Sequence, residues 1–372
     1  MSLRVAHLTT VHPAHEPRIL ERECVSLQEA GYEVHLIVPH DKPEVYRGVQ
    51  VHNLMPVRGR VRRFLKAQWE LYRAARELQA DLYHYHDPEL FLAALALKCQ
   101  GKKIIVDVHE NLPEQILFKN WVHPLIRSSV AKLAGVIERH LYKRFDGIVV
   151  VVPDLLVKFP PEKTALVRNF PALDPADFAG AQAYQNRPNS LLYVGRVEEG
   201  RGALEMCELV AALPKELTVS LQLAGPMSTV EIERTLKTHA AASHITFLGW
   251  QSRTQVRQLL GQARVGLNLL RPLPNYLKAL PTKAFEYMAA GLPVLSTDLP
   301  LLSPIIEKHK CGIIVPSQDT AATVKALEWL LTHPKEAEEM GRRGQEAVLS
   351  EYSWGAEFRT LRNLYEKILG AG

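Results

Sequence analysis

Residues 280–300 read LPTKAFEYMAAGLPVLSTDLP, a short helix that leads directly into an apolar strand. Thr282 is expected to cap the helix, because a threonine oxygen can accept from the free N–H groups of a first turn. Gly291 is expected to end the helix, and Pro293 stands just before the strand 294–296. A helix joined so tightly to a buried strand is typical of an α/β fold with a parallel sheet.

The same alternation of strand and helix runs outward in both directions. In the first half it predicts strands at 3–9, 33–39, 82–86, 103–109 and 147–152, with helices at 17–30, 61–79, 88–97 and 123–144. In the second half it predicts strands at 190–194, 218–224, 244–247, 265–270, 294–296 and 312–315, with helices at 201–212, 230–241, 253–263, 283–290, 320–332, 334–349 and 354–369. The expected architecture is therefore two doubly wound, Rossmann-like parallel-sheet domains.

The length of 372 residues also favours two domains over one. A stretch rich in Pro, Gly and Asn at 169–189 interrupts the alternation and is interpreted as the hinge. The predicted parts are an N-terminal domain over 1–168, a C-terminal domain over 169–353 and a last helix over 354–372. Since ligands of such sheets bind outside the carboxyl ends of the strands, a cleft between the domains is the expected site.

The composition is that of an ordinary folded protein. The chain is 47% hydrophobic and 23% charged, which excludes a disordered or collagen-like chain. Its four cysteines are scattered singly, so neither a disulfide framework nor a structural zinc site is indicated. No apolar run reaches the ~18–20 residues of a membrane span, and no leader-like segment is seen at the start. A cytoplasmic protein is expected.

The formal net charge of +5 lies entirely in residues 1–170, because the remainder carries as many acidic as basic side chains. Basic residues and tryptophans there are interleaved with apolar ones, notably at 58–63 (RGRVRR), Lys66, Trp69, Lys119, Trp121, Arg127, Lys132, Arg139, Lys143 and Arg144. This pattern suits peripheral docking on an anionic membrane, such as the inner membrane surface. A solvated charged face is the alternative, and nucleic acid is not expected because the charge is modest for such a partner.

The helix at 282–290 carries the first candidate site. Its N-terminus, with Lys283 beside it, forms an anion site suited to a diphosphate. Glu286, one turn further on, can accept a bidentate hydrogen bond from a ribose diol. The alternative is that Glu286 is an ordinary solvated acid.

The segment 191–204, LLYVGRVEEGRGAL, is the second candidate. A strand enters a glycine-rich turn that carries Arg196 and Arg201, whose guanidinium groups match diphosphate oxygens in charge and geometry. The glycines do not form a dinucleotide fingerprint or a P-loop. The alternative is surface charge.

Polar residues at two strand ends of the first half form the third candidate. His84, His86 and Asp87 end one predicted strand, and Asp107, His109 and Glu110 end the next. His109 can act as an acid or base or bind a hydroxyl group. The alternatives are a metal site or capping residues. No DxD or HExxH pattern accompanies these residues, so no metal is expected.

Taken together, these segments resemble family 4 glycosyltransferases of the GT-B fold over nearly the whole chain. HEPRILERECVSLQEAGYEVHLIVP resembles the opening helix and second strand of that family, and VDVHENLPE the segment whose histidine, here His109, lies near the transferred sugar. YVGRVEEGRG resembles the diphosphate clamp, with Arg196 matching its arginine and Arg201 in place of its lysine. LPTKAFEYMAAGLPVLSTDLP resembles the donor motif, with Glu286 as the ribose ligand. EYSWGAEFRTLRNLYEKIL resembles the helix that crosses back to the first domain.

The resemblance implies transfer of a sugar from a nucleoside diphosphate sugar to an acceptor hydroxyl, with retention and without metal or another cofactor. Thr282, Lys283 and Lys278 join the donor side, and His86, Asp87, Glu110 and Arg18 the acceptor side. A lipid-linked or membrane-proximal acceptor, and a role in cell-envelope or polysaccharide synthesis, fit the basic first half.

One position departs from the family pattern. Lys278 stands where the family's E-x7-E motif has its first glutamate, so the contact of that acid with the sugar cannot be carried over. Base contacts are expected near 249–251 and sugar contacts near 275–280. The alternatives are a nucleotide-sugar epimerase on the same fold, an inverting GT-B transferase, and a two-domain small-molecule binding protein.

Overall fold

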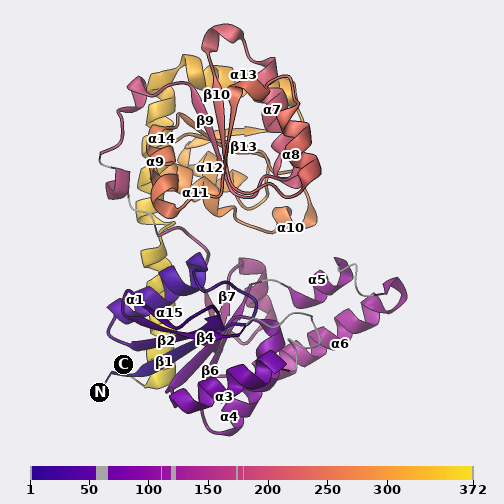
Figure 1. Cartoon of the computed structure of the whole chain (residues 1–372), viewed down its shortest axis with the longest axis vertical. Coiled ribbons are helices and arrows are strands. Elements are labelled where there is room, and N and C mark those ends of the chain that lie inside the picture. Colours follow the sequence, from indigo (N-terminus) through magenta and orange to yellow (C-terminus); the bar gives the residue numbers. More distant parts are fainter. Residues whose placement is uncertain are drawn as a thin grey trace. The chain divides into compact units, whose positions relative to one another are not determined.

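The computed structural model describes residues 2–55, 66–109, 111–118, 123–172, 175–178 and 180–370. It divides the chain into two compact units, each with its own parallel sheet (Figure 1). The first unit is Met1–Asn169 together with Gly355–Gly372, and the second is Phe170–Trp354. The prediction of two Rossmann-like α/β domains is confirmed.

The sheet of the first unit has eight strands in the order β3-β4-β2-β1-β5-β6-β7-β8. All neighbours are parallel except β3 and β4. The strands are β1 (Arg4–Leu8), β2 (Glu33–Pro39), β3 (Glu44–Tyr46), β4 (Val49–Leu54), β5 (Leu82–Tyr85), β6 (Lys103–Val108), β7 (Gly147–Val150) and β8 (Thr164–Leu166).

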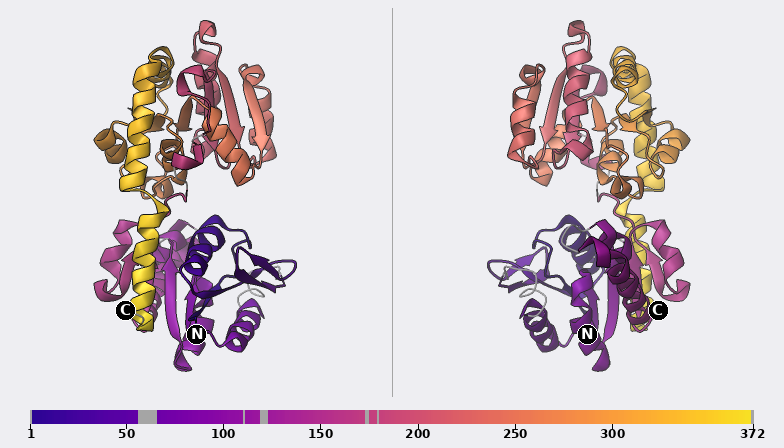
Figure 2. Two further views of the ribbon diagram at one scale, coloured as in Figure 1. Left: turned by 90° about the vertical axis from the view of Figure 1, so that its left-hand side faces the viewer. Right: turned by 90° about the vertical axis from the view of Figure 1, so that its right-hand side faces the viewer.

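Helices cover both faces of this sheet (Figures 1 and 2). They are the π-helical segment η1 (Pro17–Cys24), which continues as α1 (Val25–Glu29), then α3 (Gln68–Leu78), α4 (Phe91–Cys99), α5 (Leu112–Phe118), α6 (Pro124–Tyr142) and α15 (Trp354–Leu369). Alternation along the strands sorts the side chains between the two faces. Ala6 and Leu8 of β1 pack in the core with α3 and α4, whereas His7 between them reaches Tyr365 of α15.

The last helix, α15, is held to the first unit by polar and apolar contacts. The buried carboxylate of Glu357 accepts hydrogen bonds from the backbone and side chain of Arg168, at 2.6–3.0 Å. A Cβ atom on Gly147 of β7 would lie 2.7 Å from Ile368, so the absence of a side chain there lets the helix pack against the strand.

The sheet of the second unit is fully parallel, in the order β11-β10-β9-β12-β13-β14. Its strands are β9 (Ser190–Val194), β10 (Ser220–Ala224), β11 (Ile245–Gly249), β12 (Val265–Asn268), β13 (Val294–Thr297) and β14 (Gly312–Val315). The six strands β4-β2-β1-β5-β6-β7 of the first sheet, numbered in the order of the chain, follow the order 3-2-1-4-5-6 of dinucleotide-binding folds, and so do the six strands of the second sheet. The point where the order reverses lies between β1 and β5 in the first unit and between β9 and β12 in the second.

The helices of the second unit also lie on both faces of its sheet (Figure 2). They are α7 (Ala203–Ala212), α8 (Val230–Lys237), α9 (Arg253–Gln262), α10 (Pro274–Leu277), α11 (Thr282–Ala289), α12 (Ser303–His309), α13 (Thr320–Thr332) and α14 (Pro334–Ser350). Among the residues described in either unit, no helix combines the length and the apolar character needed to cross a bilayer.

Some predicted elements differ in detail. The helix expected over 17–30 begins as the π-helical η1, and the hairpin β3–β4 and helix α5 had no counterpart in the prediction. Of the helix expected over 61–79, residues 61–65 lie outside the described part, and α3 accounts for Gln68–Leu78. Arg201, expected to open a helix, lies in a 3₁₀ turn (Glu199–Arg201), because Gly202 in the left-handed region ends that turn before α7 begins.

Candidate functional site

The first candidate site lies at the carboxyl ends of β9 and β12, where the strand order of the second unit reverses. Helix α11 is fixed at this point by the buried Tyr287, whose hydroxyl donates to the carbonyl of Leu267 at 3.2 Å and accepts from the N–H of Val194 at 3.0 Å. Because Gly266 has no side chain, the Tyr287 ring lies directly on β12. The helix therefore presents its N-terminus beside the loop that follows β9.

Two cationic side chains converge over Gly195, the first residue of that loop. A Cβ atom on Gly195 would lie 3.4 Å from Nζ of Lys283 and 3.5 Å from Nη1 of Arg201. The φ angle of Gly195 is +130°, a conformation that only glycine adopts readily. Bare backbone below two cations and beside a helix N-terminus forms an anion site.

Arg201 is held in place by its neighbours. Its Nε donates to Oε1 of Glu198 at 2.8 Å, and the hydroxyl of Tyr276 donates to the same oxygen at 2.7 Å. The guanidinium also lies 5.9 Å from the centre of the Tyr276 ring. These contacts hold Nη1 of Arg201 toward Gly195, so the side chain need not rearrange when an anion binds.

Lys283 is buried without a compensating charge. Its Nζ lies 3.8 Å from the centre of the Tyr193 ring and has no hydrogen-bond partner in the described residues. Burial, together with the nearby Arg201 charge, lowers the pKa of the Lys283 amine well below its ordinary value, although Glu286 and Glu198 act in the opposite direction. A bound anion would supply the missing partner and favour the protonated amine.

The other predicted donor residues lie around this pair. Arg196 is exposed, and its carbonyl accepts a hydrogen bond from the hydroxyl of Tyr193. Glu286 is half-buried in α11, and Lys278 is exposed next to α10. The interpretation of Thr282 as the helix cap is wrong: α11 begins at Thr282 itself and Pro281 precedes it, so the threonine side chain does not occupy the cap position.

Gly195 gives a direct test of the anion site. We expect Gly195→Ala to weaken pyrophosphate binding by at least about tenfold, because the methyl group would enter the space between the two cations and the backbone would be strained. Titration calorimetry measures the change. Gly180→Ala is the control, since a methyl group there meets nothing within 4 Å. Equal affinity of the Gly195 variant and the wild type would contradict the site.

The second candidate site lies at the carboxyl ends of β1, β5 and β6 in the first unit. Asp87, just after β5, accepts from the backbone N–H groups of Thr10 (2.5 Å) and Val11 (3.1 Å) and from the Thr9 hydroxyl (2.9 Å). Asp87 is only 3% exposed, so it orders the loop after β1. His12 of that loop lies 3.4 Å from the other oxygen of Asp87.

The carboxylate of Asp107 is the electrostatic centre of this site. Burial alone would raise its pKa, but the Arg18 guanidinium, His109 and His86 together outweigh burial, and the pKa of Asp107 lies well below its ordinary value. Nε2 of His109 lies 3.0 Å from Oδ2 of Asp107, and the His109 side chain is 31% exposed. An ionised carboxylate behind a partly exposed imidazole orients the ring and leaves Nδ1 for a substrate hydroxyl.

Two of the remaining acceptor-side residues, Arg18 and His86, are buried, and the third, Glu110, is not among the described residues. Arg18 is 2% exposed and contacts Asp107 at 3.2 Å, so its contribution passes through that carboxylate. His86 is equally buried and also contacts Asp107 at 3.2 Å. His86, Asp107 and His109 offer atoms close enough to share a cation, and Arg18 also lies 3.2 Å from Asp107.

Several residues of these sites were not predicted. Tyr193, Tyr276 and Glu198 surround the anion site, although Tyr276 falls in the loop where sugar contacts were expected. In the first unit, Glu23 and Tyr365 lie against the histidines of β1 and β5. A glutamate in a predicted helix, such as Glu23, is expected to face solvent, so the sequence did not predict its burial.

Two family models match the chain. "Glycosyl transferases group 1" covers residues 178–347, and "Glycosyltransferase Family 4" covers residues 18–164. Both matches fall within the predicted domains.

Known proteins resemble the chain over most of its length. It is 24% identical over 372 residues to a phosphatidyl-myo-inositol mannosyltransferase of Mycolicibacterium smegmatis, covering 93% of this chain and 88% of that protein. The structure superposes on sucrose-phosphate synthase of Thermosynechococcus elongatus with a TM-score of 0.76 at 18% identity, and both chains are covered completely. It superposes on Anabaena HepE, solved in complex with UDP and glucose, with a TM-score of 0.73 at 11% identity over 98% of this chain and 100% of that chain. These likenesses establish the GT-B fold.

Proposed function

The chain belongs to the family 4 glycosyltransferases, and we propose that it transfers a sugar from a nucleoside diphosphate sugar to an acceptor hydroxyl, with retention of the anomeric configuration. The observation that carries the donor class is the convergence of Lys283 and Arg201 over the bare backbone of Gly195. A diphosphate has the charge and oxygen spacing for this site. The solved complexes of HepE with UDP support a nucleotide donor.

The anion site acts on the leaving group. As the bond from the anomeric carbon to the diphosphate breaks, negative charge grows on the β-phosphate. Arg201, a protonated Lys283 and the N-terminus of α11 stabilise that charge, which is the kind of preorganised interaction that lowers a barrier most. These groups can take the place of a divalent cation, so we propose that transfer needs no added metal.

The acceptor attacks from the same face in this scheme. Its oxygen forms the new bond to the anomeric carbon, and its proton passes to the departing diphosphate oxygen. His109, backed by ionised Asp107, holds a hydroxyl of the transferred sugar. Glu286 binds the ribose diol. In this scheme Lys278, where the family has an acid, meets the diphosphate or an acidic sugar.

A panel of nucleoside diphosphate sugars tests the function. We expect at least one donor to raise the melting temperature, and the same donor with an extract-derived acceptor to give a product of unchanged anomeric configuration by NMR, without added Mg²⁺ or Mn²⁺. An inverted product would contradict retention. An epimer formed from donor and water alone would favour an epimerase, and no binding of any nucleoside diphosphate would contradict both.

Helix α6 supports a membrane-proximal acceptor. Ile126, Leu133 and Ile137 are exposed at spacings that place them on one face of the helix. The cations Lys132, Arg139 and Lys143 are exposed beside this stripe. We propose peripheral docking of α6 on an anionic membrane surface at the cytoplasmic side, with a lipid-linked acceptor. The basic segment 58–63, Lys119 and Trp121 lie outside the described residues.

Liposome binding tests this surface. We expect Leu133→Glu with Ile137→Glu to reduce binding to anionic vesicles by about tenfold or more, since two apolar anchors are lost and two negative charges added. Leu349→Glu, at an exposed position of α14, is the control and should bind normally. Cosedimentation with anionic and neutral vesicles measures the effect. Equal binding of the wild type to both kinds of vesicle would contradict the proposal.

A further inference from the structure

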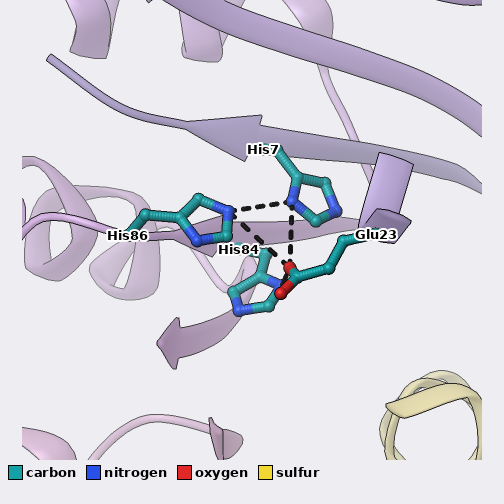
Figure 3. Close-up of side chains that lie close together, drawn as sticks. All are labelled: His7, Glu23, His84 and His86. Carbon is teal, nitrogen blue, oxygen red and sulfur yellow. Dashed lines mark hydrogen bonds and ion pairs between the residues drawn. The ribbon is translucent and has the colours of Figure 1, made fainter. Parts of the chain in front are cut away.

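Four side chains of metal-binding type lie together in the interior of the first unit (Figure 3). His7 lies in β1, His84 lies in β5 and Glu23 lies in η1. His86 directly follows β5. None is more than 2% exposed, and one ligand atom from each lies within 4.8 Å of the others. Three elements distant in sequence therefore direct nitrogen and oxygen atoms at one point.

Glu23 has an incomplete environment. Neither of its carboxyl oxygens has a hydrogen-bond partner in the described residues, although Nε of Arg18 lies 3.0 Å from Oε1. The other oxygen, Oε2, faces the imidazoles, at 3.8 Å from Nδ1 of His7, 3.8 Å from Nδ1 of His84 and 4.0 Å from Nε2 of His86. A buried carboxylate that makes no hydrogen bond is costly, and the ion pair with Arg18 involves only Oε1, so Oε2 has no hydrogen-bond partner among the described residues. A cation at this point would complete the environment.

The outer contacts of His7 and His86 leave their inner nitrogens available, whereas Nδ1 of His84 lies 2.8 Å from the Tyr365 hydroxyl and exchanges that contact for the metal. Nδ1 of His86 lies 3.2 Å from Asp107, and Nε2 of His7 lies 3.1 Å from the Tyr365 hydroxyl. If each outer nitrogen carries the proton, Nε2 of His86 and Nδ1 of His7 are free to bind a metal, and these two atoms are 2.9 Å apart. A carboxylate or hydroxyl behind a histidine is the usual outer partner of a metal ligand.

We propose that His7, Glu23, His84 and His86 bind one divalent transition-metal ion of the zinc class. The separation of 2.9 Å between His7 and His86 and those of 3.8–4.0 Å from Glu23 to the three histidines bracket the about 3.3 Å expected between ligands of a tetrahedral ion with bonds of about 2.0–2.1 Å, and all four atoms lie within 4.8 Å of one another. Three nitrogens and one oxygen suit zinc and disfavour Mg²⁺ or Ca²⁺, which prefer oxygen ligands.

Four protein ligands leave no open position, so the ion has a structural role. It ties β1, β5 and η1 together, and through the contact of His7 Nε2 with Tyr365 it also fixes α15 to the sheet. It takes no part in donor binding and is independent of the proposed transfer reaction. The competing arrangement is metal-free, with a proton shared between His7 and His86 in a hydrogen-bonded chain from Tyr365 to Asp107.

Metal analysis of the full chain decides between the two. The protein is purified without a polyhistidine tag from cells grown with added zinc, and its metal content is measured by inductively coupled plasma mass spectrometry. We expect about one equivalent per chain. Protein produced with cobalt should show the visible absorption of four-coordinate Co²⁺. No bound zinc and no cobalt spectrum in the wild type would overturn the site.

Variants locate the ion. Glu23→Gln should lower metal affinity by about 10–100-fold, as loss of a ligand or its support does. His40→Ala is the matched control, because His15, His40 and Glu44 form a second, more exposed group of ligand type. If Glu23→Gln does not fold, the wild-type measurement still decides. Metal retained in Glu23→Gln, or lost in His40→Ala, would overturn the assignment.

Discussion

Replacement of His109 with alanine is expected to lower kcat by about 10²–10⁴-fold, the range for loss of a group that handles a proton or a hydroxyl in the transition state. The ring lies 3.0 Å from Asp107, whose ionised form is maintained by the buried Arg18. The substitution removes the partly exposed imidazole and leaves that carboxylate in place. Steady-state kinetics with saturating donor measures kcat, and nucleotide affinity should change little.

The control for this prediction is His333→Ala, an exposed histidine of the second unit that contacts Trp329. It should keep wild-type kcat. If His109→Ala retains kcat within about threefold of the wild type, His109 does not contact the transferred sugar in the reaction. Loss of nucleotide binding together with kcat would indicate a fault in folding, which thermal unfolding detects.

Lys283→Met is expected to weaken binding of the nucleoside diphosphate by about 10²–10³-fold, by analogy with the loss of a preorganised charge-stabilising donor. Methionine is also a long, unbranched apolar side chain, but it removes the amine that lies over the Tyr193 ring and near Gly195. The same substitution should increase the stability of the fold. Because the amine is buried without a partner, its removal should raise the free energy of unfolding by about 1–3 kcal/mol.

Two measurements check this pair of effects: titration calorimetry for affinity and chemical denaturation for stability. Lys215→Met, at an exposed position of the second unit, is the control and should change neither. A Lys283 variant that binds the nucleotide normally would remove the main support for the donor site. A variant that is both less stable and normal in binding would assign the lysine a structural role.

The position of both sites could be predicted because it follows from strand ends. Parallel strands bring residues that follow them to one edge of the sheet, so His86, Asp87 and His109 were expected together from their places after two apolar runs. The same reasoning placed Arg201 and Lys283 near one another. The roles of individual residues, such as Glu286 as the ribose ligand, came from the family resemblance, because the spacing of apolar residues does not predict them.

The surroundings of these residues could not be predicted. The lysine at 283 was expected beside a helix N-terminus, but its burial over Tyr193 depends on packing between elements about 90 residues apart. The burial of Glu23 depends on η1, a π-helical segment that a period of 3.6 does not describe. His7 and Glu23 are far in sequence from His84 and His86, so no metal-ligand spacing was visible. The strand β3 has only three residues, too few to show a pattern, whereas β4 (VQVHNL) begins with an alternation of buried and exposed residues that the prediction missed.

The most direct test of the donor site counts the protons that accompany nucleotide binding. Calorimetric titrations at about pH 8.5, in two buffers of different ionisation enthalpy and without added divalent metal, give this number. At that pH the diphosphate is fully ionised, so proton uptake reports Lys283, because burial lowers the pKa of its amine well below the ordinary value in the free protein and a bound anion favours the protonated form. We expect proton uptake when the wild type binds the nucleotide, none with Lys283→Met, and an affinity that falls as pH rises. Binding by the wild type without proton uptake, or binding only after a divalent cation is added, would contradict the proposed donor site.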